Sequence, residues 1–293
     1  MDDALARYGE WLATTRRYVA RNKREYLDDV SDLVAYLQTR CNLRSPVSVQ
    51  RRHLEGFLAH CVTLRHAPGT RRRSVASIRS FFAFLVADGA LRASPAEHLL
   101  LPEREDRPPR VLTEAEYMRL RRVAADSPRD LAIIETILQT GFRLSEVARL
   151  TVDDVALSPI DPRVSLPLGH LRVAGRGHRS RTVTLNIRAC EALSAHLAGR
   201  GETDSPSLFL TKFGKGLGPR GIEDIVAKRM AAAGVAGASA RSLRHTMAVE
   251  MLKRGASVAI VAEMLGHATT ETMAVYEDAV RERMDAEMQK AAI

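Results

Sequence analysis

The chain has 293 residues, of which 45% are hydrophobic and 27% are charged, and its formal net charge is +9. This length and composition predict a globular protein of about one to two domains with a substantial core. The positive excess, mostly arginine, favours a polyanionic partner over a merely basic soluble protein, because Lys and Arg contacts to phosphates supply the salt-dependent part of DNA affinity.

The cysteines and the N-terminus argue against several classes of protein. Cys41, Cys61 and Cys190 are scattered along the chain, which argues against a disulfide framework and a zinc site and fits a reducing cytoplasm. Residues 1–17 contain no apolar signal-peptide core, and no run of about 18 apolar residues occurs anywhere. We therefore expect a cytoplasmic protein with no membrane span.

Residues 3–100 are predicted to be helical throughout. The first helix is expected from Leu5 to about Arg21, and the fourth from an N-cap at Thr70 to a stop at Gly89. Apolar residues at helical spacing mark the second, third and fourth helices: Leu33, Val34, Leu37, Leu54, Phe57, Leu58, Ile78, Phe81, Phe82 and Leu85.

A linker is expected where the composition changes. Residues 101–112 carry three prolines and a dense run of charges with few apolar anchors, a composition typical of linkers. We therefore expect an N-terminal helical domain at residues 1–104, a linker at 105–112 and a second domain at 113–293.

The second domain is predicted to be mixed. Thr113 and Glu116 form a capping-box pattern, and residues 130–150 read as two helices broken at Gly141. Strand signals are confined to residues 154–185, where 171–185 read as a hairpin around a Gly-Arg-Gly turn, and from residue 186 the chain is expected to be helical again. The expected class is mainly α with a small β-hairpin or sheet, that is α+β, beside an all-α N-terminal domain.

Three motifs in this second domain could carry chemistry. In TGFRLSE, at residues 140–146, Gly141 allows a turn and Arg143 sits near a helix start, where free N–H groups favour an anion. SLRHT, at residues 242–246, opens another helix, and LGH, at 265–267, precedes Tyr276 by nine residues. Each motif taken alone also fits an ordinary surface or structural residue.

The order and spacing of the three motifs together resemble the tyrosine recombinase family, which includes phage integrases and Xer-type recombinases. The resemblance covers nearly the whole chain, including a helical DNA-binding domain ahead of the catalytic domain. It implies that Arg143 and Arg244 are the two catalytic arginines and that Tyr276 is the nucleophile. It also implies that His267 belongs to the site and that Glu146 supports it.

Two positions depart from the family pattern. The hairpin turn is Gly175-Arg176-Gly177, where the family has a lysine between the glycines. The histidine of the family's H-x-x-R motif falls at Arg241. Both departures place a permanent positive charge where the family has a proton-transfer group.

The implied reaction is transesterification at phosphorus. Arg143 and Arg244 would clamp the non-bridging oxygens, where charge develops in the transition state, and His267 would donate a hydrogen bond. Tyr276, whose free phenol has a pKa of about 10, would lose its proton and form a 3′-phosphotyrosyl intermediate. The scheme requires no metal and no cofactor.

The departing 5′-oxygen needs a proton, and arginine stays protonated far above neutral pH. Three explanations are open. Either Arg176 stabilises the leaving oxygen by charge or hydrogen bonding, or His178 in the same turn supplies the proton, or the chain is catalytically impaired. We favour the first.

Duplex DNA is the expected partner. Phosphate contacts are expected from the arginines that open two N-terminal helices, although charge runs are also typical of solvated faces. These residues are Arg71, Arg72, Arg73, Arg51 and Arg52.

The tail at 281–293 resembles an amphipathic helix that would dock on a neighbouring protomer of a homotetramer. The chain shows no additional N-terminal arm-binding domain, which points to a simple site or to an accessory DNA-bending or directionality protein.

Three functions other than recombination also fit parts of the sequence. Residues 257–276 resemble a helix-turn-helix, which fits a non-catalytic DNA-binding regulator, but a regulator would not need all four catalytic residues. A type IB topoisomerase shares the nucleophile chemistry. A degenerate family member, with Arg176 and Arg241 substituted, would keep only binding. The target sequence, and whether the chain is a phage integrase or a resident recombinase, are not predicted.

Overall fold

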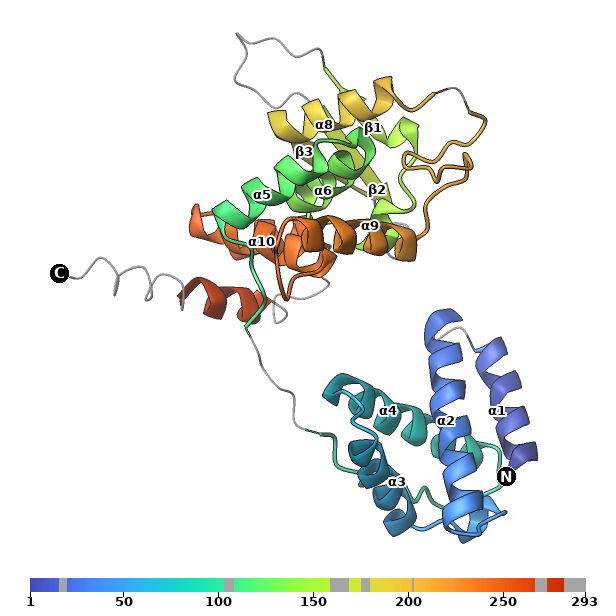
Figure 1. Ribbon diagram of the computed structural model, residues 1–293. Coiled ribbons are helices and arrows are strands. Elements are labelled where there is room, and N and C mark those ends of the chain that lie inside the picture. The colour runs from blue at the N-terminus through green and yellow to red at the C-terminus, as the bar shows by residue number, and fades with distance from the viewer. Residues whose placement is uncertain are drawn as a thin grey trace, which may run out of the picture. The chain divides into compact units, whose positions relative to one another are not determined.

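The computed structural model describes residues 1–15, 20–102, 108–158, 169–174, 180–201, 203–266 and 273–281. The chain divides into two compact units, Met1–Asp106 and Arg107–Ile293 (Figure 1). Most of the described residues are helical, and a small sheet lies in the second unit, which confirms the predicted fold class. Within these described ranges, no helix is both long and apolar enough to cross a membrane.

The first unit is built from helices that share one apolar core. Their bounds are α1 Asp2–Thr14, α2 Ala20–Arg40, α3 Arg51–Thr63 and α4 Pro68–Ala87, with a short 3-10 helix at Pro46–Ser48. The apolar faces predicted for the second, third and fourth helices are buried in this core, where Leu37, Leu54 and Phe81 have no exposed surface. Burial of one apolar face per helix stabilises the unit, as the helical spacing indicates.

Two helix boundaries in this unit differ from the prediction. The first helix was expected to reach about Arg21, but it ends at Thr14, and Thr15 is extended. The Thr14 hydroxyl donates to the Trp11 carbonyl at 3.0 Å, a local bond that competes with helix continuation. The fourth helix begins at Pro68 rather than after Thr70, because the fixed φ of proline suits the first helical position.

The second unit packs helices against one face of a three-stranded sheet. The helices are α5 Glu114–Ala124, α6 Pro128–Thr140, α7 Leu144–Val147, α8 Ile187–Ala198, α9 Pro219–Ala232, α10 Ala240–Lys253 and α11 Val258–Leu265, and residues 274–281 are also helical. The strands are β1 Val155–Leu157, β2 Gly169–Ala174 and β3 Ser180–Leu185. They pair antiparallel in the order β1-β2-β3 (Figure 1).

The sheet has one buried face, as the alternation predicts. Leu171 on β2 pairs with Val183 on β3, and both side chains are buried in a core that also includes residues of α6 and α8. The predicted pairing of this hairpin is confirmed, while its turn at 175–179 lies outside the described residues. The expectation that the chain is helical again from residue 186 is confirmed for α8 to α11 but is wrong between α8 and α9, where the described residues are non-helical and form bridges such as Leu210↔Gly216.

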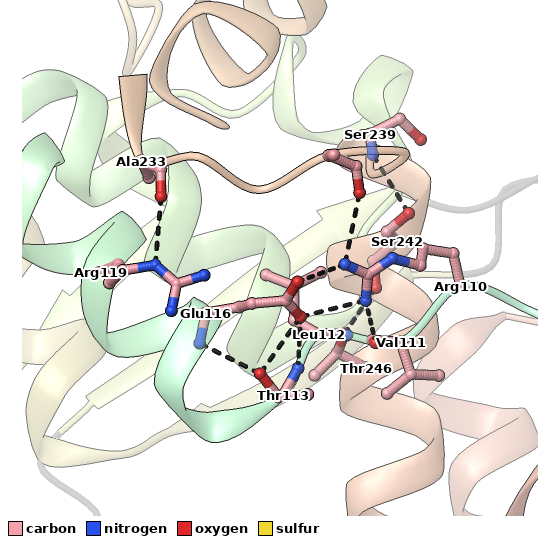
Figure 2. A network of polar contacts seen from close by, with 11 residues as sticks. Arg110, Val111, Leu112, Thr113, Glu116, Arg119, Ala233, Ser239, Ser242 and Thr246 are labelled. Atoms are coloured by element: carbon pink, nitrogen blue, oxygen red, sulfur yellow. Dashed lines mark hydrogen bonds and ion pairs between the residues drawn. The ribbon is translucent and has the colours of Figure 1, made fainter. Parts of the chain in front are cut away.

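The chain enters the second unit through a network of polar contacts (Figure 2). Thr113 and Glu116 form the predicted capping box at the start of α5. Arg110 donates to Glu116 Oε2 at 3.1 Å and to the Ala236 carbonyl at 3.3 Å. The Leu112 N–H donates to Thr246 Oγ1 on α10 at 2.9 Å.

Apolar packing fixes the same segment. Val111 and Leu112 are both buried, and Val111 packs in the cluster that contains Tyr276. Val111 and Leu112, the last residues of the expected linker at 105–112, are thus anchored on the second unit.

Candidate active site

Two helices of the second unit end at glycines in the left-handed conformation. Gly141 follows α6 with φ +64°, and Gly266 follows α11 with φ +61°. A Cβ on Gly141 would lie 2.3 Å from Met247 Cε and 2.8 Å from Leu265 Cδ2. The left-handed backbone favours glycine at this position, and an added Cβ would also displace the ends of the Met247 and Leu265 side chains.

Three arginines converge on the carboxyl end of α11, where they bind three consecutive carbonyl groups. Arg181 Nε donates to the Met264 carbonyl at 2.9 Å, and Arg244 Nη2 donates to the Leu265 carbonyl at 2.7 Å. Arg143 Nη2 donates to the Gly266 carbonyl at 3.1 Å. The last carbonyls of a helix have no partner within it and carry the negative end of its dipole. This helix end therefore holds the three guanidinium groups together.

A buried carboxylate joins two of these arginines. Glu146 on α7 is 3% exposed; it accepts from Arg143 Nη1 at 3.1 Å and from Arg181 Nη1 and Nη2 at 3.1 and 3.0 Å. Burial alone raises the pKa of Glu146. Hydrogen bonds from Arg181 and from the Arg143 backbone, together with both positive charges, outweigh burial and lower the pKa below its usual value. The carboxylate is thus ionised and fixes the direction of both guanidinium groups.

Arg244 lies deeper than Arg143. It is 8% exposed and also donates to the Gly141 carbonyl, so it ties the ends of α6 and α11 to α10. Burial, followed by the charge of Arg143, lowers the pKa of Arg244 to about 10. This value is still well above neutral pH, so Arg244 stays a cation. The Arg143 side chain is 40% exposed and therefore accessible to an anion from solvent.

Tyr276 packs beside this cluster. It is 4% exposed, and its hydroxyl lies 3.0 Å from His245 Nδ1. Burial raises the pKa of the phenol, while the charges of Arg244, Arg241 and Arg143 and a hydrogen bond from Arg244 oppose that rise without reversing it. The phenol is therefore protonated at neutral pH and surrounded by cations that favour its anion.

The structure brings together Arg143, Arg244, Glu146 and Tyr276, as their motifs predict. Arg241 is exposed on α10, and its charge favours the Tyr276 phenolate. The other predicted site residues, His267 and Arg176, and the alternative proton donor His178 lie outside the described residues.

Two residues at the site were not predicted. Arg181 contacts Glu146 and also lies over the Phe142 ring, 4.9 Å from its centroid. His245 contacts Tyr276. His245 belongs to the SLRHT motif and was a possible signal, whereas Arg181 is a single arginine within a strand pattern.

The N-terminal arginines differ in how they are held. Arg73 donates to Asp29 through Nε and Nη2, each at 2.9 Å. Arg51 pairs with Glu55 at 2.6 Å on the surface of α3. Arg72 donates to the Pro102 carbonyl. Arg73 thus has an intramolecular role in joining α4 to α2. A DNA contact by Arg71, Arg72, Arg73, Arg51 or Arg52 stays a prediction.

The chain matches two family models, one for each unit. The model of the phage integrase family matches residues 110–283, and that of the phage integrase N-terminal SAM-like domain matches residues 5–89. Among similar proteins, tyrosine recombinase XerC of Mycobacterium sp. (strain KMS) is 32% identical over 94% of both chains. Tyrosine recombinase XerD of Listeria innocua is 27% identical over 97% of this chain and 96% of that protein.

Solved structures share the fold. XerH site-specific recombinase, in a post-cleavage complex with palindromic difH substrate, has a TM-score of 0.76 and 17% identity, and the match covers 97% of this chain and 84% of XerH. A lambda integrase tetramer bound to a Holliday junction has a TM-score of 0.70 and 15% identity over 92% of this chain and 77% of that one.

Proposed function

The chain belongs to the phage integrase family, and we propose that it is a site-specific DNA recombinase that cuts and rejoins DNA through Tyr276. Its relatives XerC and XerD are named tyrosine recombinases. The observation that carries the assignment is the environment of the Tyr276 hydroxyl, which lies in the field of Arg244, Arg241 and Arg143. A phenol near three cations, two of which are held by hydrogen bonds, is suited to attack an anionic phosphodiester.

The arginine cluster supplies the electrostatic part of catalysis. Arg143 and Arg244 bind the non-bridging oxygens of the scissile phosphate, where additional negative charge develops as Tyr276 attacks. Because Glu146 and the end of α11 already hold both guanidinium groups, little reorganisation is needed in the transition state. His267 donates a further hydrogen bond, on the basis of its place in the LGH motif.

The covalent intermediate is a 3′-phosphotyrosyl ester with a free 5′-hydroxyl on the other DNA end. The ester conserves the energy of the phosphodiester, so religation needs no nucleotide cofactor. Attack by a 5′-hydroxyl from a second duplex exchanges strands, which serves integration, excision or resolution.

We assign the stabilisation of the leaving 5′-oxygen to Arg176. This residue stabilises the 5′-oxygen by charge or hydrogen bonding rather than by acting as an acid. DNA with a 5′-bridging phosphorothiolate tests this, because its sulfur leaves without protonation. The Arg176→Ala variant should cleave that DNA better than normal DNA. Equal impairment on both substrates would exclude a leaving-group role.

The substrate is duplex DNA, and each unit contacts it. The N-terminal unit matches a SAM-like phage integrase domain, and its surface arginines supply phosphate contacts. XerH and lambda integrase are described as DNA complexes, the latter also as a tetramer on a Holliday junction. These complexes support a homotetramer on DNA for this chain, and an accessory DNA-bending or directionality protein is proposed to assist it.

A trapping experiment tests the function. The cleavage-deficient Tyr276→Phe variant selects binding sites from a random duplex library, and the recovered site is rebuilt as a nicked suicide substrate from which the cut fragment diffuses away. The wild-type protein should form a DNA complex that resists SDS. Absence of that complex on a site that the protein binds would contradict the enzyme assignment.

A further inference from the structure

His245 is the group that the catalytic scheme leaves unused although it touches a reacting atom. Its Nδ1 lies 3.0 Å from the Tyr276 hydroxyl, and the two ring centroids are 5.4 Å apart at an interplanar angle of 52°. His245 follows Arg244 on α10, so one turn of helix presents a cation and an imidazole to the site. The helix is held by Arg244, bound to the ends of α6 and α11, and by Thr246, bound to Leu112.

The Tyr276 proton needs an acceptor. Burial keeps the pKa of the phenol raised despite the nearby cations, so the proton must leave during attack. Among the described residues, the charged groups that act on this phenol are Arg143 at the N-cap of α7 and Arg241 and Arg244 on α10. All three are guanidinium groups, which have no acceptor atom. The Glu146 carboxylate is engaged by Arg143 and Arg181.

The imidazole of His245 can accept the proton of Tyr276. A neutral histidine carries one acceptor nitrogen, and its ordinary pKa of about 6.5 makes it the side chain most suited to exchange a proton near neutral pH. The family's H-x-x-R histidine is replaced by Arg241 in this chain, one helical turn before His245. Position 245 therefore offers an imidazole where position 241 offers none.

We propose that His245 is a catalytic residue that accepts the proton of Tyr276 during DNA cleavage and returns it during religation. The inference rests on the proposed function and adds to it the identity of the base. It requires the neutral tautomer with hydrogen on Nε2, so that Nδ1 accepts.

Cleavage transfers the phosphoryl group from the 5′-oxygen of the DNA to Tyr276. An oxygen lone pair of Tyr276 forms the bond to phosphorus while the phenol proton moves to His245 Nδ1, giving an imidazolium. The bond from phosphorus to the 5′-oxygen breaks, and that oxygen keeps the electron pair and takes a proton from water. In religation the 5′-hydroxyl attacks, its proton returns to water, and the imidazolium reprotonates the departing Tyr276 oxygen.

A variant that keeps the hydrogen bond but removes the base tests the proposal. Asparagine can place an amide near the position of Nδ1, so H245N should bind DNA as the wild type does. Its single-turnover cleavage of a saturating suicide substrate should fall by about 10²-fold or more, the usual contribution of a general base. The matched control is H60N, because His60 stacks on Tyr36 at the same 5.4 Å centroid distance in the first unit; its cleavage rate should not change.

Replacing Tyr276 by an acidic fluorotyrosine separates a base from a positioning group. A more acidic phenol needs less help from a base, so the rate difference between wild type and H245N should shrink several-fold. An undiminished difference, or an H245N rate equal to wild type, would overturn the proposal and leave His245 a structural neighbour. If the wild-type protein forms no covalent complex at all, the proposed function fails and this inference fails with it.

A pH profile keeps the test valid if H245N folds poorly, as a melting curve would reveal. In the wild type the cleavage rate should rise with pH as His245 loses its proton. The midpoint of that rise should stay unchanged when fluorotyrosine replaces Tyr276. A midpoint that moves down with the acidity of the phenol would show that Tyr276 itself titrates, which would overturn the assignment.

Discussion

Arg181 on β3 donates two hydrogen bonds, at 3.1 and 3.0 Å, to the buried carboxylate of Glu146 on α7. This pair joins the sheet to α7, whose N-cap is Arg143, and Glu146 binds Arg143 through its other contacts. The position of Arg143, whose side chain is accessible from solvent, is thus determined by a buried ion pair.

Loss of the Arg181 side chain should impair both folding and cleavage. Arg181→Met removes two hydrogen bonds from the buried Glu146 carboxylate and leaves it with Arg143 as its partner. The loss of hydrogen bonds to a charged group should lower the free energy of unfolding by about 1.5–3 kcal/mol. Misplacement of Arg143 should slow cleavage by about 10²-fold. Urea unfolding and single-turnover cleavage measure the two effects.

Arg172→Met is the matched control, because Arg172 pairs with Asp154 at 3.5 Å on the neighbouring strand and its side chain is 62% exposed. Surface pairs contribute about 0–1 kcal/mol, so this variant should be nearly as stable as wild type. Equal losses of stability in Arg172→Met and Arg181→Met would contradict the role given to the buried pair.

Gly141 should not tolerate a side chain. Gly141→Ala combines a left-handed backbone, which costs about 1–2 kcal/mol for an L-residue, with a Cβ placed 2.3 Å from Met247 Cε. Gly234→Ala isolates the first effect, because Gly234 has φ +63° and no neighbouring atom within 4 Å of its Cβ. The Gly141 variant should be less stable than the Gly234 variant by about 1–3 kcal/mol, the cost of overpacking. Equal melting temperatures would show that the Met247 and Leu265 side chains move away from the added Cβ at no cost in stability.

Glu116 should make the entry network sensitive to acid. The hydrogen bond from Arg110 is the main cause that lowers the pKa of Glu116 to about 2, compared with about 4.3 in an unfolded chain. A lowered folded-state pKa means that the stabilisation is complete above about pH 4.3 and is lost as the pH falls towards 2.

Glu116→Gln should therefore reduce the free energy of unfolding by about 1–2 kcal/mol at pH 6, a size typical of a lost capping interaction. The difference from wild type should narrow as the pH falls between these two values. Glu114→Gln, an exposed carboxylate in the same helical turn, serves as the control in urea titrations at each pH. A difference between wild type and Glu116→Gln that is constant with pH would contradict the role of its charge.

The arginines of the N-terminal unit should separate into two classes. Arg51→Gln and Arg52→Gln remove surface charges and should each lower the slope of log affinity against log salt by about 1. Arg73→Gln removes the partner of buried Asp29 and should instead lower stability by about 2 kcal/mol, as for a hydrogen bond to a charged group. Fluorescence anisotropy at several salt concentrations, with melting curves, distinguishes the classes. An unchanged salt slope in the first two variants would remove them from the DNA interface.

Local patterns in the sequence predicted the features that depend on nearby residues. The capping box of Thr113 and Glu116 and the turn at Gly141 involve residues within one helical turn, so their chemistry is visible in a short window. The apolar spacing of Ile78 and Phe81 likewise located a buried helix face.

Contacts between distant residues were not predictable in this way. Glu146 and Arg181 are 35 positions apart, and His245 and Tyr276 are 31 apart. Their meeting depends on strand register and on how α10 packs against the helix at 274–281. The pairing of Arg73 with Asp29, 44 residues away, was likewise not indicated by any local pattern.

The central claim is that Tyr276 becomes covalently joined to DNA, and mass spectrometry of the trapped complex tests it most directly. After nuclease and protease digestion of the SDS-resistant complex, the nucleotide adduct should lie on Tyr276, as a phosphotyrosyl ester to a 3′-end. The Tyr276→Phe variant should bind the same site and give no adduct. An adduct on any other residue, or a covalent complex that persists in Tyr276→Phe, would contradict the account.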